Sequence, residues 1–182
     1  MTNDMTKGNP LKIFIYFTIP LLIGNIFQQL YSMVDTIIVG RFVGVNALAA
    51  LGACNSLFFL VNGLVLGLTS GFAVLVAQKF GAKDEKGVKK AVASNITLTI
   101  VLTVIITIVA LLAVKPLLNM MNTPENIYED ARIYITLIYA GIITQTGYNM
   151  AAGILRALGD SKTPLYFLIV ASILNVILDL IF

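Results

Sequence analysis

The stretch ITLTIVLTVIITIVALLAV, residues 96–114, runs for nineteen residues without a charged side chain. A helix needs about 20 mostly apolar residues to cross the hydrocarbon core of a bilayer. An amphipathic helix of a soluble protein would show a polar face at every turn, whereas this stretch offers only threonines, which can bond their own backbone. The stretch therefore predicts a membrane-spanning helix, and with it an all-α integral membrane protein.

The composition of the whole chain agrees with this prediction. Of 182 residues, 58% are hydrophobic and 12% are charged, and the mean hydropathy is +0.93. Soluble domains carry about 25% charged residues. A small domain buries only a limited fraction of its surface, so this much apolar surface favours the lipid bilayer as solvent and partner.

Several kinds of chemistry are excluded within the chain. It has no histidine and a single cysteine, Cys54, so it has no histidine-based nucleophile or metal site and no intramolecular disulfide. It has no phosphate-binding glycine loop with its lysine. The segments between apolar stretches are short and leave no room for a soluble catalytic domain. We expect no enzyme activity, no cofactor and no nucleic-acid partner.

Five apolar segments approach or exceed the length of a bilayer crossing. The first two are longer than a simple crossing requires, so tilt or kinks are expected. The chain ends inside the fifth segment, and we therefore expect the N-terminal part of a longer protein or a truncated gene product. The five segments cover about residues 13–39, 48–77, 93–114, 133–155 and 165–182.

Basic residues are unevenly divided between the two ends of these segments. The set flanking the outer ends holds three: Arg41, Lys115 and Arg132. Because loops rich in Lys and Arg stay in the cytoplasm, we expect a multi-pass protein of the cytoplasmic (inner) membrane with its N-terminus in the cytoplasm. The opposite set holds nine: Lys7, Lys12, Lys79, Lys83, Lys86, Lys89, Lys90, Arg156 and Lys162.

The first segment carries polar side chains on one face, among them the carboxylate of Asp35 in YSMVDTIIVGR, residues 31–41. They lie within a sector of roughly 120° on a helix. This face should look into the helix bundle or a wet cavity, because a charge facing lipid is costly. The alternative is that its amides and hydroxyls join helices together. The set is Asn25, Gln28, Gln29, Ser32, Asp35 and Thr36. Pro20 lies in the same segment and predicts either a static bend or a hinge.

The fifth segment carries a possible counterpart to Asp35. Asn175 and Asp179 are four residues apart and share a helix face. At a rise of 1.5 Å per residue, Asp179 lies roughly 20–25 Å from the cytoplasmic end of its helix, and Asp35 roughly 30 Å along its own. The three side chains could form one site for a proton or for Na⁺. The alternative is that Asp179 sits at the outer interface.

The fourth segment has a polar patch one turn long, made of Gln145, Tyr148 and Asn149. Gln145 and Asn149 could line a substrate cavity with Gln28 and Ser32, or the patch could satisfy itself against a neighbouring helix. Three classes of function remain open: a secondary transporter, a membrane-embedded enzyme acting through Asp35 and Asp179, and a structural subunit. The enzyme would need its two carboxylates within direct hydrogen-bonding reach.

Four motifs resemble those of the multidrug and toxic compound extrusion (MATE) family, in order and over essentially the whole chain. They are SMVDTIIVGRFVG at 32–44, AQKFGAKD at 77–84, LRALGDSKTP at 155–164 and NVILD at 175–179. The resemblance implies five helices of an N-terminal six-helix lobe, taken from a twelve-helix fold of two lobes. The C-terminal lobe would then be missing.

The resemblance also implies a function, namely export of organic, often cationic, compounds in exchange for H⁺ or Na⁺. It implies ion coupling by Asp35, Asn175 and Asp179, and bending of the first helix at Pro20. Two alternatives are a lipid-linked saccharide flippase of the same fold and a non-transporting structural membrane fragment.

Overall fold

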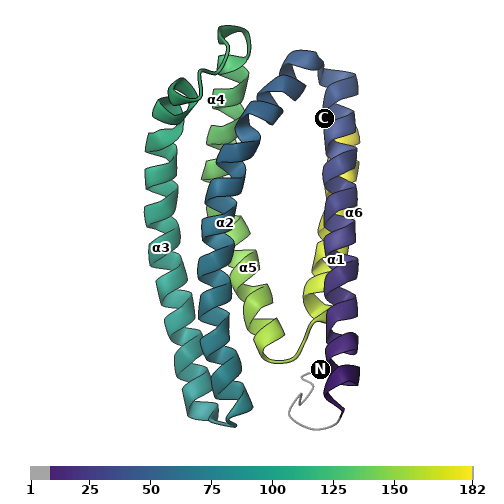
Figure 1. Cartoon of the computed structure of the whole chain (residues 1–182), viewed down its shortest axis with the longest axis vertical. Helices are drawn as coiled ribbons and strands as arrows, with labels where there is room; N and C mark the ends of the chain where they lie inside the picture. The colour runs from purple at the N-terminus through teal and green to yellow at the C-terminus, as the bar shows by residue number, and fades with distance from the viewer. Residues whose placement is uncertain (1–8, 182) are drawn as a thin grey trace.

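The structure, a computed structural model, describes residues 9–181, and within the last helix it leaves the side chains of residues 179 and 180 outside the described part. The described residues form six α-helices and one short π-helix, without a strand (Figure 1). The elements are α1 (Pro10–Ile38), η1 (Val39–Val43), α2 (Val45–Gly81), α3 (Glu85–Met120), α4 (Glu125–Ala140), α5 (Ile142–Ala157) and α6 (Lys162–Ile181). The all-α prediction is confirmed.

Three helices are long and apolar enough to cross a membrane: α1 continued through η1, α2, and α3. Both α2, with 37 residues, and α3, with 36, extend beyond their apolar stretches. Each is roughly 55 Å long, against about 30 Å of hydrocarbon core. Their ends therefore reach the headgroup region on both sides of a bilayer.

The fourth apolar segment, expected as one helix over 133–155, is divided at Gly141. The Gly141 amide donates to the carbonyls of both Leu137 and Ile138 at 3.1 Å, which tightens the last turn of α4. Helix α5 begins at the next residue. The apolar stretch of the fifth segment lies in α6 over Lys162–Leu178, and it is shorter than the others.

Side-chain caps fix where two of the helices begin. Asp84 starts α3, since its Oδ1 accepts from the Gly87 amide at 2.8 Å. Asp160 precedes α6, where its Oδ1 accepts from the amides of Lys162 and Thr163, and its Oδ2 from the Thr163 hydroxyl at 2.7 Å. The hydrogen bonds from Thr163, followed by that from Lys162, hold the pKa of the Asp160 carboxyl below its usual value.

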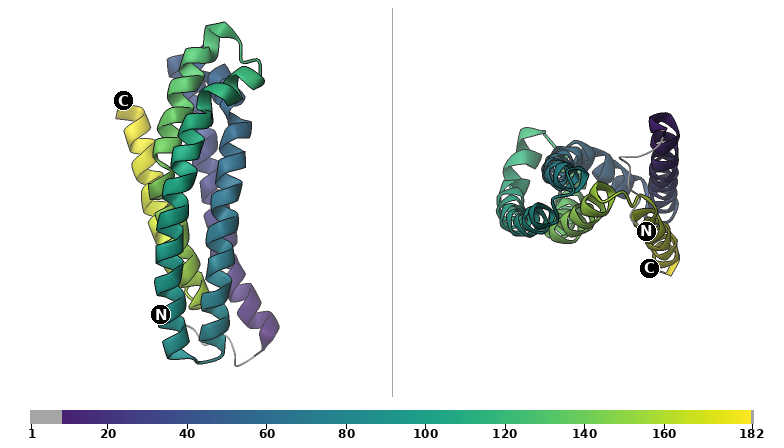
Figure 2. Two further views of the ribbon diagram at one scale, coloured as in Figure 1. Left: turned by 90° about the vertical axis from the view of Figure 1, so that its left-hand side faces the viewer. Right: turned by 90° about the horizontal axis from the view of Figure 1, so that it is seen from below.

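The helices form two groups. Helices α2, α3, α4 and α5 pack together as a bundle, while α1 packs on α6 (Figure 1). Figure 2 shows the same separation from below, with α1 and α6 beside the bundle. Within the bundle, the Tyr139 hydroxyl donates to the Leu57 carbonyl at 3.1 Å, and the Cys54 thiol to the Ala131 carbonyl at 3.3 Å. These two polar groups are thus satisfied between helices, as a membrane interior favours, whereas Asn95 Nδ2 and the Thr107 hydroxyl have no hydrogen-bond partner among the described residues.

Helix α1 reaches the bundle through η1. The π-helix continues α1 without a break and contacts both α1 and α2. It ends at Gly44, whose φ of 120° is open to glycine and strained for residues with a Cβ. The chain then turns directly into α2, so the Val39–Gly44 segment joins the α1–α6 pair to the bundle.

Candidate functional site

A close contact sets the register between α1 and α6. Gly24 is buried in α1, and a Cβ at this position would lie 3.4 Å from Leu168 Cδ2 and 3.6 Å from Leu165 Cδ1. The two helices run in the same direction (Figure 1). Height along both helices can therefore be counted from this contact.

This register brings Asp35 and Asn175 to similar heights on facing sides of the two helices. Asp35 follows Gly24 by eleven residues, which is three turns with a rotation of about 20°, so it lies on the same face of α1. Asn175 follows Leu168 by seven residues, two turns with a similarly small rotation. The level of Asp35 on α6 is found eleven residues after Leu165 and Leu168, the same spacing as from Gly24 to Asp35. It corresponds to residues 176–179, just beyond Asn175. Asp179 belongs to this stretch of α6, and its side chain lies outside the described residues.

The Asn175 amide has an unsatisfied acceptor. Its Oδ1 is buried and accepts no hydrogen bond from any of the residues that the structure describes. An amide oxygen without a donor in an apolar environment costs on the order of 1–3 kcal/mol. A cation, a water molecule or a protonated carboxyl group beside it would remove that cost. The arrangement therefore fits a small ligand between α1 and α6.

Asp35 is partly buried in the last turns of α1, the helix that packs on α6. Its carboxylate lies close enough to Tyr134 of α4 to act on the phenol electrostatically. Tyr31, one turn earlier in α1, likewise acts electrostatically on the phenol of Tyr148 in α5. Tyr134 was not among the residues predicted from the sequence. The sequence did offer a signal for it, because Tyr134 lies near the outer end of the segment 133–155. This is the depth that we expect for Asp35.

The remaining polar residues of α1 lie on the surface of this structure. Gln28 and Ser32 are exposed, as are Asn25, Gln29 and Thr36, and the Thr36 hydroxyl donates to the Ser32 carbonyl at 2.8 Å. Pro20 is buried within α1, on the side that meets α6 one turn before Gly24. Of the six residues on the predicted polar face of α1, only Asp35 is thus partly buried.

The polar patch of α5 makes direct contacts with other helices. Gln145 Nε2 donates to Asn62 Oδ1 of α2 at 2.7 Å. The Tyr148 hydroxyl donates to the Pro164 carbonyl of α6 at 3.2 Å. Asn149 is partly buried on the same helix. The structure therefore favours the interpretation that Gln145 links α5 to α2. Asn149 stays a candidate for the predicted substrate cavity.

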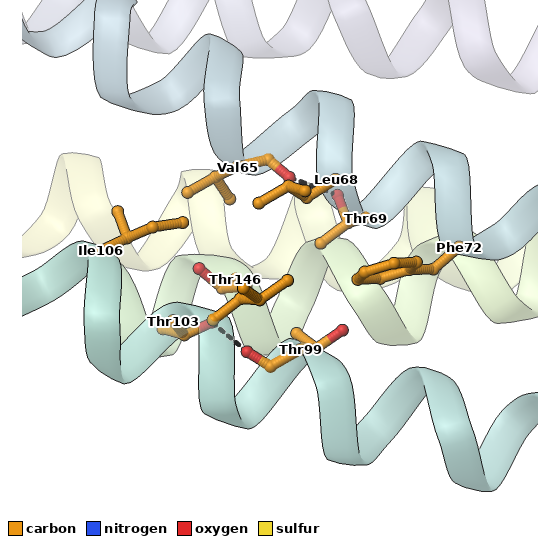
Figure 3. A pocket seen from close by; sticks show the side chains of 9 residues that line it. Val65, Leu68, Thr69, Phe72, Thr99, Thr103, Ile106 and Thr146 are labelled. Carbon is orange, nitrogen blue, oxygen red and sulfur yellow. Dashed lines mark hydrogen bonds between the residues drawn. The ribbon is translucent and has the colours of Figure 1, made fainter.

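A small pocket lies elsewhere, between α2, α3 and α5, and its centre has room for about one water molecule (Figure 3). Its threonine hydroxyls mostly bond the backbone of their own helices: Thr69 to Val65 O at 2.9 Å, Thr103 to Thr99 O at 2.6 Å and Thr146 to Ile142 O at 2.7 Å. The walls are therefore largely apolar. None of the predicted ion or substrate residues lines this pocket.

No group of three or more Cys, Asp or Glu residues within the described part of the chain is arranged to hold a metal ion. A site at Asp35 and Asn175 would need further oxygen ligands. The α1–α6 pair and the bundle beside it, with three helices among the described residues apolar enough to span a bilayer, define a multi-pass membrane protein.

Comparison with known proteins identifies the family. The MatE family model matches residues 20–181, and the chain belongs to this family. It is 32% identical over 179 residues to the probable multidrug resistance protein YpnP of Bacillus subtilis (strain 168), which covers 98% of this chain and 40% of that protein.

Solved structures give the same result. A MOP superfamily transporter from Pyrococcus furiosus matches with a TM-score of 0.90 and 32% identity over 96% of this chain and 38% of that one. A multidrug resistance MATE family transporter in an outward-facing conformation also matches with a TM-score of 0.90 and 32% identity, and the match covers 96% of this chain and 39% of that one. The chain thus spans about 40% of the curated relatives' length, as an N-terminal part. These matches are to transporters and a multidrug resistance protein, not to enzymes.

Proposed function

We propose that the complete protein exports organic, often cationic, compounds across the cytoplasmic membrane in exchange for H⁺ or Na⁺. Family membership supports transport, since relatives such as YpnP are named multidrug resistance proteins. The observation that carries the coupling is the register of α1 and α6. Counted from the Gly24–Leu168 contact, Asp35 and the unsatisfied Oδ1 of Asn175 stand at similar heights on facing sides, which supports the proposal.

Charge neutralisation at this site is the proposed coupling step. A proton on Asp35 would remove its negative charge, whereas Na⁺ would balance that charge and take Asn175 Oδ1 as a neutral ligand. Asp179 is proposed as the second carboxylate of the site. Once the negative charge is neutralised, a cationic substrate near Gln28 and Ser32 loses its electrostatic attraction to α1.

The conformational change follows from differential affinity. An ion can shift the protein between inward- and outward-facing states only if it binds one of them more tightly. Asp35 lies on the helix that packs on α6, and its charge acts through space on Tyr134 of α4, so a change in that charge affects both groups of helices. Pro20 is proposed as the hinge, because it removes a backbone hydrogen bond within α1. Asn149 is proposed to line the substrate cavity.

The test is efflux of a cationic dye from vesicles holding the full-length protein, driven by an imposed Na⁺ or pH gradient. Asp35→Asn should abolish gradient-driven efflux, while Asp35→Glu should keep part of it. Asp130→Asn, the same change at an exposed position of α4, serves as the matched control. Undiminished efflux by a correctly inserted Asp35→Asn protein would refute the coupling role. Wild-type efflux indifferent to both gradients would refute antiport.

A second candidate function is transport of a lipid-linked saccharide. The Pyrococcus furiosus relative is described as having a binding pocket of reverse polarity that suggests a different function, so this fold serves more than one function. Flipping of a fluorescent lipid-linked saccharide in vesicles, without dye efflux, would favour this candidate over multidrug export.

A further inference from the structure

The turn between α2 and α3 carries an unusual density of lysine side chains. Residues 79–90 contain five lysines and two acidic residues, a net charge of +3. Asp84 is already engaged, since its Oδ1 caps α3 and its Oδ2 lies 3.4 Å from Lys79 Nζ. The other four lysines are exposed: Lys83, Lys86, Lys89 and Lys90. These four are called the lysine cluster below.

Within the described residues, no recorded ion pair neutralises the lysine cluster. The structure records ion pairs for Lys79 and for Arg132, and it records none for the four clustered lysines with any carboxylate of residues 9–181. Lys86, Lys89 and Lys90 lie three and four residues apart, so they project from one side of the first turns of α3. Glu85, the second acidic residue of the segment, offsets part of this charge, and the remaining repulsion among the lysines favours an external anion.

The position of the cluster relative to a membrane indicates which anion is available. The turn joins the ends of α2 and α3, two helices long and apolar enough to span a bilayer. Each exceeds the hydrocarbon thickness by roughly 25 Å, which carries its ends through the headgroup region. Lys83 has a φ of 56°, a turn conformation that reverses the chain at this level. Long lysine side chains there reach the phosphates of the adjoining leaflet.

The opposite end of the bundle, at the start of α4, offers a contrast. Arg132 Nε donates to Glu129 Oε2 at 2.9 Å, and the two residues form an ion pair. Glu125 and Asp130 add further negative charge on α4. Arg132 is therefore balanced by a neighbouring carboxylate, and residues 125–132 carry a net charge of −2, so charge complementarity to an anionic surface is greater at the lysine end.

We propose that the lysine cluster binds the headgroups of anionic phospholipids in the leaflet that surrounds the α2–α3 turn. Juxtamembrane clusters of basic residues gain about 1 kcal/mol per Lys or Arg at an anionic membrane surface. Bound lipid holds the ends of α2 and α3 together and so stabilises the folded bundle. This role is separate from transport, and it acts on the folded protein rather than on its insertion.

The experiment compares lipid binding by purified full-length protein and its variants. Phosphatidylglycerol, phosphatidylcholine and inorganic phosphate are added separately, and bound lipid is counted by native mass spectrometry alongside the thermal unfolding midpoint. Phosphatidylglycerol should bind and raise the midpoint, and the other two should not. The variants are Lys86→Gln, Lys89→Gln and Lys90→Gln, made singly and combined in a triple variant. Phosphatidylglycerol binding should fall roughly fivefold for each lysine replaced.

Two control variants separate the proposal from a general effect of charge. The corresponding Lys→Arg triple variant keeps the charge and should keep phosphatidylglycerol binding. Combining Arg41→Gln, Lys115→Gln and Arg132→Gln removes the same charge at the opposite end and should leave binding unchanged. Unaltered binding by the Lys→Gln variant would overturn the proposal. So would equal loss in the opposite-end variant, or equal stabilisation by inorganic phosphate. If the Lys→Gln triple variant fails to insert, Lys90→Gln alone tests the proposal. A roughly fivefold loss of phosphatidylglycerol binding supports it, and unchanged binding overturns it.

Discussion

Gly24 of α1 lies directly against Leu168 of α6, where a Cβ would come within 3.4 Å of the leucine side chain. This contact aligns Asp35 with the stretch of α6 that contains Asn175 and Asp179. A larger side chain at position 24 would separate the helices or shift one along the other. The geometry of the candidate ion site thus depends on a residue without a side chain, three turns away from it.

Gly24→Leu should therefore lower both stability and coupling. Overpacking a close helix contact costs about 1–3 kcal/mol, and displacement of α1 would separate Asp35 from Asn175. Thermal unfolding and gradient-driven efflux measure the two effects. Gly63→Leu is the matched control, because a Cβ at Gly63 meets nothing within 4 Å. Equal behaviour of the two variants would show that the contact does not set the register.

Tyr134→Phe should change the response of efflux to the coupling ion. The phenol interacts electrostatically with Asp35, so loss of its hydroxyl should weaken ion binding several-fold without unfolding the bundle. The dependence of efflux on Na⁺ or pH measures this effect. Tyr128→Phe, on the same helix, is the control. An unchanged ion dependence would remove Tyr134 from the site.

Gln145 and Asn62 should show an energetic coupling across α5 and α2. Their 2.7 Å hydrogen bond lies within the bundle, and such bonds in membrane proteins average about 0.6 kcal/mol. A double-mutant cycle with Gln145→Ala and Asn62→Ala measures the coupling free energy from unfolding. Additive effects of the two changes would argue instead for a role of Gln145 in the cavity.

Asp160 should make stability depend on pH. Hydrogen bonds from Thr163 and Lys162 favour its charged form and lower its folded-state pKa. A carboxyl with a depressed folded pKa contributes stability that is complete above its unfolded pKa of about 3.9 and is lost as pH falls through the folded value. Asp160→Ala should cost about 1 kcal/mol near neutral pH. The difference between the unfolding midpoints of wild type and variant should shrink below about pH 4. A difference that stays constant down to pH 2 would contradict this assignment.

Orientation can be tested with introduced cysteines, because the native Cys54 is buried. Lys83→Cys and Asn126→Cys place exposed thiols at opposite ends of the bundle. The distribution of basic residues predicts that a membrane-impermeant reagent added outside labels position 126 and spares position 83. The reverse pattern would place the N-terminus outside.

Much of the fold was predictable because hydropathy is a local property. A bilayer demands long apolar helices wherever a segment crosses it, so residues 96–114 indicate a span without reference to any other part of the chain. The family was predictable from four motifs in order, and the match over residues 20–181 confirms it. The polar residues of the candidate site were also predictable, since a carboxylate in an apolar helix requires a reason.

The amino-acid sequence by itself determined the membrane class, the apolar segments, the family and the identity of Asp35, Asn175 and Asp179 as candidates. Tertiary structure alone decided which of these meet. It paired α1 with α6 through Gly24, set Asp35 where its charge acts through space on Tyr134, and gave Gln145 a partner 83 residues away. It also divided the fourth segment at Gly141. The physical reason is that lipid and protein interior are equally apolar, so hydropathy cannot tell which face of a helix meets a neighbour. That choice depends on side-chain shape and on hydrogen bonds between residues far apart in the chain.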